Sequence, residues 1–402
     1  MRVLLMSTIA VSTISSTPAG QGPADSAAEA TRFSAASLLP KLAPGANACL
    51  SPYSIQSALA MTYAGAAGET KSQMAAALGF PADAAALAGS FAALDAAIQA
   101  SSSDEMAVHT ANRLFGARGF QFREAFLEIC KTKFGAPLDE LDFKKDPGAA
   151  TRAINKWVEQ QTRDRIANLV PDGALTRDTT LVLANALYLK MPWQESFRPA
   201  GDLPFQIADA QPVPVPAIRQ TARFGYDKHG GFTIVSVPFK GSSFLFCLFL
   251  PESDKGDKGD AAPPKAANYL HAANLPQRKV SLTLPKFRLE PPTIALGQIL
   301  QSLGMTTAFD IPPGSADFDA MAPRLPDDYL YISEVFHKTF FDLDENGVEA
   351  AAATAVVMMR ATAFIPEEEP VKVFADRPFY FAVLHPLTGA CLFAGRLTDP
   401  RR

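Results

Sequence analysis

Apolar and polar positions follow two different periods along the chain. Alanine-rich segments at 28–42 and 54–78 carry apolar residues at helical spacing, and Gly65 and Gly68 interrupt the second segment. Ser51, followed by a proline, precedes that segment in the position of a helix cap. These patterns predict that the first third of the chain is mainly helical.

A further amphipathic helix is predicted over 151–169, where Ile154, Trp157 and Val158 share one face. The period then shortens, and four strand-like runs with turn residues between them follow at 179–190, 232–239, 244–250 and 280–287. Helices first, strands later, no βα alternation and no internal repeat predict an α+β fold in one large domain.

Composition narrows the class of protein. The 402 residues are 48% hydrophobic, which is enough for a large core. Because 37 Lys and Arg stand against 41 Asp and Glu, with no basic stripe, nucleic acid is not an expected partner. The four cysteines lie far apart, which favours buried free thiols over a metal site or a disulfide framework.

Residues 1–27 leave two interpretations open. Arg2 precedes a short apolar run at 3–6, and a Ser/Thr-rich stretch continues to about Ala19. The run is too short to cross a bilayer and too diluted for a clear signal, so this segment is predicted to be an export signal or a disordered tail. A single domain is expected over 28–402, without a membrane span.

Motifs of enzymes are missing from the sequence. No G-x-S-x-G elbow, H-E-x-x-H helix or nucleotide-binding glycine loop is found. The stretch 342–347, DLDENG, matches the start of a calcium-binding loop, but Ala353 stands at the twelfth position, where a glutamate is required. We therefore expect neither an enzyme nor a bound metal or other cofactor.

The segment 345–363, ENGVEAAAATAVVMMRATA, stands out because small uncharged residues directly follow the strand-like run 338–343. Alanine favours helix. From Thr354 onward, β-branched residues favour strand instead, so this segment can adopt either state.

These residues resemble the hinge of the inhibitory serpins, serine protease inhibitors, and the resemblance, to prokaryotic-type members, runs from about residue 28 to residue 400. Blocks similar to the family occur in its order: SPYSIQSALAMTYAGAAGETKSQM (51–74), TANRLF (110–115), INKWVEQQTRDRIANLV (154–170), LVLANALYLKMPWQESF (181–197), HKTFFDLDENGVEAAAAT (337–354) and RPFYFAVLHPLTGACLFAGRLTDP (377–400). The resemblance implies a metastable fold of three β-sheets and about nine helices, with a reactive loop within 345–376.

The family resemblance also implies a mechanism. A protease cleaves the reactive loop as a suicide substrate, and the cleaved loop inserts into the central sheet and traps the acyl-enzyme. Small uncharged side chains permit that insertion without burying charge. The hinge residues implied are Glu345, Gly347, Val348, Glu349, Ala350, Ala351, Ala352, Ala353 and Thr354.

The scissile bond in the family lies at a fixed distance from the hinge glycine, and counting fourteen residues from Gly347 selects the bond between Ala361 and Thr362. A small residue before the bond predicts an elastase-like or subtilisin-like target. Cleavage between Arg360 and Ala361, by a trypsin-like protease, is the alternative.

Supporting positions are implied by the same resemblance. Ser51, Ser54, Asn185 and His337 match a buried hydrogen-bond cluster beneath the central sheet, where paired polar side chains are expected in any case. Trp193 matches a residue near the point of first insertion. An ion pair between Lys286 and Glu345 is expected close by.

Further expectations concern partners and location. The region 90–108 contains no Lys or Arg, so heparin-type activation is not expected. A monomer is expected outside the cytoplasm, extracellular or periplasmic, because susceptible proteases commonly act there; a cytoplasmic location stays open. The rival function is a non-inhibitory serpin, a binding or chaperone-like protein or a plain protease substrate.

Overall fold

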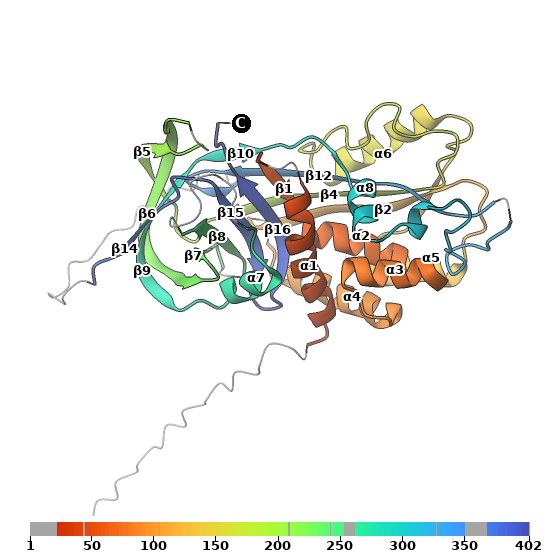
Figure 1. The fold of residues 1–402 in the computed structure, drawn as a ribbon, viewed down its shortest axis with the longest axis horizontal. Helices are drawn as coiled ribbons and strands as arrows, with labels where there is room; N and C mark the ends of the chain where they lie inside the picture. Colours follow the sequence, from red (N-terminus) through yellow and green to blue (C-terminus); the bar gives the residue numbers. More distant parts are fainter. Residues whose placement is uncertain are drawn as a thin grey trace, which may run out of the picture.

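The computed structural model describes residues 22–42, 45–103, 105–207, 210–241, 243–252, 262–326, 328–349 and 368–401. Most helices of this part lie in the first half of the chain, as predicted (Figure 1). The helices are α1 Asp25–Leu38, α2 Pro52–Ala64, α3 Gly68–Leu78, α4 Ala84–Ala100, α5 Glu124–Phe134, α6 Pro147–Gln161, α7 Ala266–Ala272 and α8 Gly297–Ser302, with the short 3₁₀ helices Leu39–Lys41 and Thr307–Phe309.

The strands of the described residues lie mainly in the second half of the chain, which confirms the α+β class. They are β1 Ala48–Leu50, β2 Ala107–Ala117, β3 Asp139–Leu141, β4 Leu181–Pro192, β5 Arg198–Phe205, β6 Val213–His229, β7 Phe232–Pro238, β8 Leu245–Pro251, β9 Gln277–Pro285, β10 Phe287–Leu289, β11 Ile294–Ala295, β12 Ile332–Leu343, β13 Gly347–Val348, β14 Val371–Phe374, β15 Phe379–His385 and β16 Ala390–Leu397.

Backbone hydrogen bonds join these strands into two networks. The central sheet has the order β10-β12-β13-β4-β2-β3, with β11 beside β12. The larger network has the order β1-β16-β15-β8-β7-β6-β9-β14, with β5 beside β6. The long strand β6 pairs first with β5 and β9 and then with β7. The resemblance implied three sheets; the described strands form two hydrogen-bonded networks, because β6 pairs with β5 and β9 at one end and with β7 at the other.

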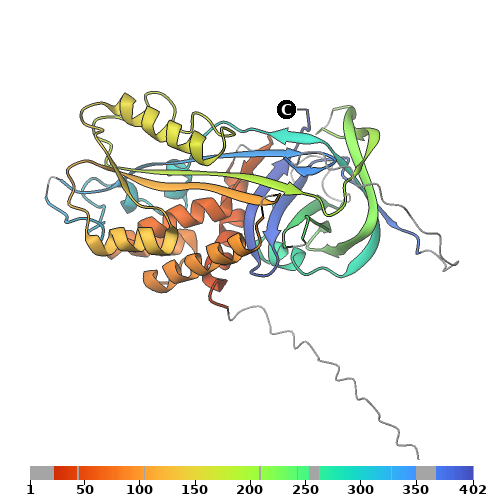
Figure 2. The same cartoon turned by 180° about the vertical axis from the view of Figure 1, so that it is seen from behind.

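Helices cover both faces of the central sheet. Figures 1 and 2 show α6 on one face and α2 to α5 on the other. Side chains of β4 alternate between these two sides, with Leu183 and Leu187 in the core beneath α2, and Ala184 and Tyr188 in a second cluster beneath α6. Burial on both faces explains why β4 is a continuous apolar run in the sequence.

The helix predicted over 151–169 begins and ends earlier than expected, because α6 spans Pro147–Gln161. Asp146 caps its start by accepting a hydrogen bond from the backbone N–H of Ala149. Its end is set by Arg163, whose left-handed φ of 52° breaks the helix. Ile166 and Leu169 still reach the cluster beneath α6, which is why the apolar pattern continued past the helix.

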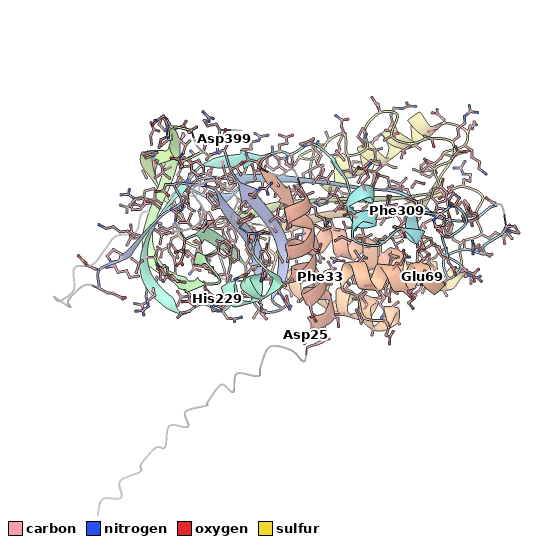
Figure 3. The ribbon with its side chains drawn as sticks, in the orientation of Figure 1. Asp25, Phe33, Glu69, His229, Phe309 and Asp399 are labelled. Carbon is pink, nitrogen blue, oxygen red and sulfur yellow. The ribbon has the colours of Figure 1, made fainter. Side chains whose placement is uncertain are left out.

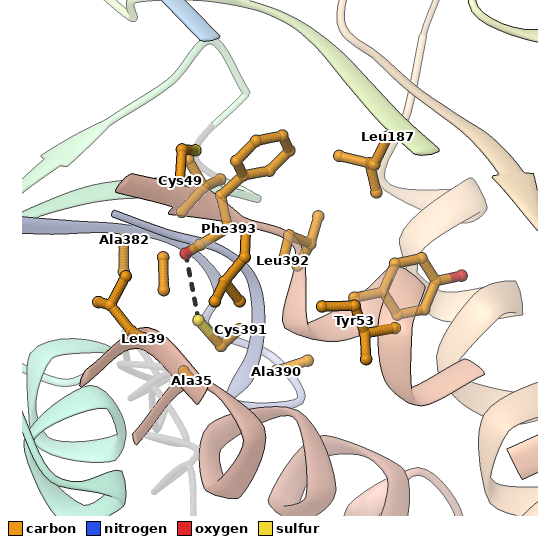
Figure 4. Packing of buried hydrophobic residues seen from close by; sticks show 14 of the residues in the cluster. Ala35, Leu39, Cys49, Tyr53, Leu187, Ala382, Ala390, Cys391, Leu392 and Phe393 are labelled. Atoms are coloured by element: carbon orange, nitrogen blue, oxygen red, sulfur yellow. Dashed lines mark hydrogen bonds between the residues drawn. The ribbon is translucent and has the colours of Figure 1, made fainter. Parts of the chain in front are cut away.

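Side chains fill the space between these layers (Figure 3), and the four cysteines lie among them as buried free thiols, which confirms that prediction. Cys391 packs between α1 and the sheet behind it (Figure 4), and its thiol lies 3.2 Å from the carbonyl oxygen of Phe393. Burial raises the pKa of Cys49 to about 12, so this thiol is not a nucleophile. None of the described helices is long and apolar enough to cross a membrane.

Candidate functional site

The central feature of the candidate site is the pair formed by β4 and β12, which run parallel side by side. Their register runs from Ile332 opposite Leu181 to Phe340 opposite Tyr188. A parallel pair has no turn joining its strands, and residues 193–331 separate them in the sequence. The two strands can therefore be parted without breaking a local connection.

The two strands have already separated at one end, where β13 lies between them. Val348 pairs in antiparallel register with Leu343 of β12 and with Met191 of β4. The backbone N–H of Glu349 donates to the carbonyl oxygen of Asp342 at 2.9 Å. Val348 is fully buried. The beginning of the predicted hinge is thus already a short strand of the central sheet.

Gly347 makes this close approach possible. Its φ is 144°, and a Cβ atom on it would lie 2.1 Å from the carbonyl oxygen of Met191 and 2.6 Å from the Cα of Pro192. Both obstacles are backbone atoms, which cannot move aside as a flexible side chain can. Glycine is therefore the residue that fits at the start of β13.

Trp193 holds the turn that leads from β12 into β13. Its indole Nε1 donates to the carbonyl oxygen of Asp344 at 2.9 Å, and its backbone N–H donates to the carbonyl oxygen of Asn346 at 2.8 Å. The indole ring stacks on Phe239 with 4.8 Å between ring centroids. The family resemblance placed Trp193 near the point of first insertion, and the structure shows it hydrogen-bonded to the turn between β12 and β13.

The expected contact between Lys286 and Glu345 is present on the same turn. Lys286 Nζ lies 3.0 Å from the carboxylate of Glu345. Burial alone would raise the pKa of Glu345, but its own backbone N–H and Lys286 together lower it below its usual range. The pair therefore joins the end of β9 to the hinge turn.

A polar row crosses the sheet farther along the β4–β12 pair. Asn185 of β4 is directly opposite Asn112 of β2 on one side and His337 of β12 on the other. His337 Nδ1 lies 2.5 Å from Asn185 Oδ1, and Ser54 Oγ donates to Asn112 Oδ1 at 2.6 Å. The row therefore joins three neighbouring strands to the start of α2.

The N-terminal end of α2 fixes the protonation state of His337. The backbone N–H of Ser51 donates to His337 Nε2 at 2.9 Å, so the neutral ring carries its proton on Nδ1 and donates it to Asn185. Ser51 Oγ in turn caps α2 by accepting from the backbone N–H of Ser54. Complete burial lowers the pKa of His337 to about 3.

Two residues of this site were missed by the sequence analysis. Asn112 lies in the quoted TANRLF block, but its place opposite Asn185 follows only from the strand register. Arg165 lies in the connection between α6 and β4, and its guanidinium pairs with the carboxylate of Glu349. Glu349 has a left-handed φ of 45°. The sequence carries no signal for the Arg165–Glu349 pair, because 183 residues separate its members.

The remaining predicted site residues lie outside the part of the chain that the structure describes. These are the alanines of the hinge, the residue after them, and both candidate bonds of the reactive loop: Ala350, Ala351, Ala352, Ala353, Thr354, Arg360, Ala361 and Thr362.

Residues 27–400 match the family model described as Serpin (serine protease inhibitor). The chain therefore belongs to the serpin family. The family is described by protease inhibition and not by an enzyme activity, which agrees with the expectation from the sequence.

Individual relatives agree with this assignment. An uncharacterized serpin-like protein of Thermococcus kodakarensis is 35% identical over 88% of this chain and 81% of its own length. The leukocyte elastase inhibitor of Sus scrofa is 34% identical over 89% of this chain and 94% of its own. Among solved structures, the thermophilic serpin tengpin in its native state is similar with a TM-score of 0.80 at 25% identity, covering 94% of both chains.

Proposed function

We propose that this serpin is an inhibitor of serine proteases that acts as a suicide substrate. In the proposed reaction the serine Oγ of the protease attacks the carbonyl carbon of Ala361, the bond to the nitrogen of Thr362 breaks, and an ester joins the two proteins. The loop up to Ala361 then enters the central sheet before water can hydrolyse the ester. One observation carries this proposal: β13 already lies between β4 and β12 at the end where the loop would enter.

The register of β13 supports full insertion. An extension of the same antiparallel register would bring Thr354 between His337 of β12 and Asn185 of β4. Directly paired residues project to the same face of a sheet, so the hydroxyl of Thr354 would face both side chains. Asn185 Nδ2, a buried donor without a partner among the described residues, would then find an acceptor.

Insertion would also satisfy the backbone of the new strand. Its parallel neighbours would be separated by about two strand spacings, or about 10 Å, and each would gain an antiparallel partner. Continuing the register, residues 348–358 span β4 from Met191 down to Leu181, so Ala361 would lie just past the start of that strand. Small uncharged residues at 350–353 avoid the cost of burying charge.

The side chain of the residue before the cleaved bond indicates the class of target protease. Ala361 suits proteases with a small specificity pocket, elastase-like or subtilisin-like, and the relative in Sus scrofa is named for inhibition of leukocyte elastase. Arg360 offers a trypsin-like protease as the alternative. We further propose that the protein acts as a monomer outside the cytoplasm, without heparin-type activation, since 90–108 lacks basic residues.

The test is incubation with elastase-like, subtilisin-like and trypsin-like proteases, followed by denaturing electrophoresis and mass spectrometry of the released fragment. We expect a covalent complex that survives denaturation and a new N-terminus at Thr362. The Arg360→Gln variant is the matched control, because it removes the trypsin-like option and leaves Ala361 in place. It should retain the complex with the elastase-like protease.

Other outcomes separate the alternatives. A new N-terminus at Ala361, lost in Arg360→Gln, would move the reactive bond by one residue. Cleavage with no complex and no rise in thermal stability would leave a plain substrate or a non-inhibitory serpin and refute the proposal.

A further inference from the structure

One face of the larger network carries an unusual concentration of positive charge. It lies on β5, β6, β9 and β14, which form one end of the molecule (Figure 1). We call it the cationic face and define it by Arg198, Arg219, Arg223, Lys279, Lys372 and Phe374. The whole chain has a net charge of −4, so this cluster departs from the average of the molecule.

The strand register places these side chains on the same face. Arg198 of β5 is directly opposite Arg219 of β6, and Arg223 of β6 is directly opposite Lys279 of β9. Arg219 and Arg223 are four residues apart on β6, so they project to the same side. Side chains of directly paired residues begin about 5 Å apart.

Strand β14 extends the face toward the reactive loop. Lys372 and Phe374 are directly opposite Ser281 and Thr283 of β9, which in turn face β6. Thr283 accepts a hydrogen bond from Arg219 Nε at 3.0 Å. Strand β14 begins four residues after the end of the segment 350–367, which contains both candidate bonds. A protease bound to that segment would therefore lie next to the cationic face.

The charge arrangement works against the stability of the sheet. Arg198 and Arg219, which have like charge, stand directly opposite one another, and such a pair is destabilising. Farther along the same face, Arg223 pairs with Glu368 at 3.5 Å, so its charge is partly offset. A repulsive arrangement that folding alone does not require points to a partner of opposite charge.

An aromatic side chain shows which kind of partner fits. Phe374 is 40% exposed on the same face as the cations. Exposed aromatic and arginine side chains together are typical of protein interfaces, whereas a polyanion needs cations alone. We propose that the cationic face is a docking surface for the target protease, and that it selects proteases with an acidic surface beside their active-site cleft. This inference rests on the proposed inhibitory function.

Electrostatic docking would act mainly on the rate of encounter. Complementary charge beside a reactive site raises association rates by factors of about 10 to 1,000, and salt screens the effect. The chemistry at the reactive bond and the insertion of the loop would be unchanged. The proposal therefore concerns which protease is captured fastest, not whether capture can occur.

The test variant removes four cations and keeps the Arg223–Glu368 pair, so that the end of the reactive loop stays anchored: Arg198→Ala, Arg219→Ala, Lys279→Ala and Lys372→Ala. The control variant removes the same charge from exposed lysines elsewhere, two on α5 and two before α6: Lys131→Ala, Lys133→Ala, Lys144→Ala and Lys145→Ala. Thermal unfolding of both variants establishes that they are folded.

The measurement is the rate constant for covalent complex formation with two elastase-like proteases that share a specificity pocket, one acidic and one basic in net charge. At about 20 mM salt we expect the test variant to react with the acidic protease at least about tenfold more slowly than the wild type, and the control variant within about twofold. At about 500 mM salt the wild type and both variants should form the complex with the acidic protease at the same rate. With the basic protease, the three rate constants should be equal at either salt concentration.

Three outcomes would refute the proposal that the cationic face is a docking surface. If the test variant and the wild type react at the same rate with the acidic protease, the face plays no part in capture. If their rates differ only after a sulfated polysaccharide is added, the face binds a polyanion instead. If the wild type forms no covalent complex with any protease, the inhibitory function itself fails, and the docking proposal fails with it.

Discussion

His337 makes the stability of the native state depend on pH in a way that can be worked out from its contacts. The ring is completely buried, and its Nε2 already accepts from the backbone N–H of Ser51. A second proton on Nε2 would face that N–H, and burial penalises the resulting charge. These contacts agree with a pKa of about 3, against 6.5 for an exposed histidine.

The sign and magnitude of this pH dependence follow from the difference between the pKa of His337 in the folded state and in the unfolded state. Because the folded state resists protonation while the unfolded state accepts it from pH 6.5 downward, the stabilising effect of neutral His337 is complete above pH 6.5 and is lost as the pH falls toward 3. With about 1.4 kcal/mol for each unit of pH over that window, the loss between pH 7 and pH 5 is about 2 kcal/mol. His385, whose pKa burial lowers to about 4, adds a loss of the same sign.

The assay compares urea unfolding of the wild type and of His337→Gln at pH 7 and pH 5, followed by tryptophan fluorescence. The variant should be less stable at pH 7, since it loses a bond of the polar row, but it should lose about 2 kcal/mol less than the wild type between the two pH values. His229→Gln is the control, because His229 is exposed at the end of β6 (Figure 3). Equal losses in the wild type and His337→Gln would refute the reasoning.

Three changes near the hinge have distinct expected effects. Lys286→Met should lower the free energy of unfolding by about 0.5 kcal/mol, since its pair with Glu345 is partly exposed; a difference that persists unchanged in 1 M salt would contradict an electrostatic cause. Trp193→Phe removes the bond to the carbonyl oxygen of Asp344 and should cost about 1–2 kcal/mol in urea unfolding; an unchanged midpoint would show that this bond contributes nothing. Thr354→Arg should raise the moles of inhibitor consumed per mole of protease several-fold, because insertion would bury a charge; a ratio that stays near one would argue against deep insertion.

The sequence predicted the class of fold well because the signals involved are local. The apolar run of β4 follows from burial on both faces, and the cap formed by Ser51 follows from the needs of a helix start. The family resemblance then supplied the order of the elements. Helix ends were harder to predict, since the left-handed φ of Arg163, and not composition, ends α6.

The site could be predicted only in part, because its contacts join distant segments. Ser51, Asn185 and His337 were expected to lie together, and they do. The line of cations on four strands depends on strand register, and the pairing of Arg165 with Glu349 depends on where the connection before β4 packs; only the folded chain reveals either. Strand register is set by tertiary packing, so no local pattern encodes it.

If the proposed inhibition is to be directed at new target proteases, the close fit around Gly347 decides which changes of the loop can be made. Met191 and Pro192 fix the point where β13 enters the sheet, so in the proposed insertion the face to which each later residue projects would be decided by its distance from Gly347. Substituting the residues around the cleaved bond without changing the length of the loop would preserve the face to which each residue projects. Inserting or deleting a single residue ahead of them would turn each buried side chain outward and each outward side chain inward. Under the proposed mechanism, retargeting by substitution would therefore preserve insertion of the loop, whereas a change of loop length by one residue would not.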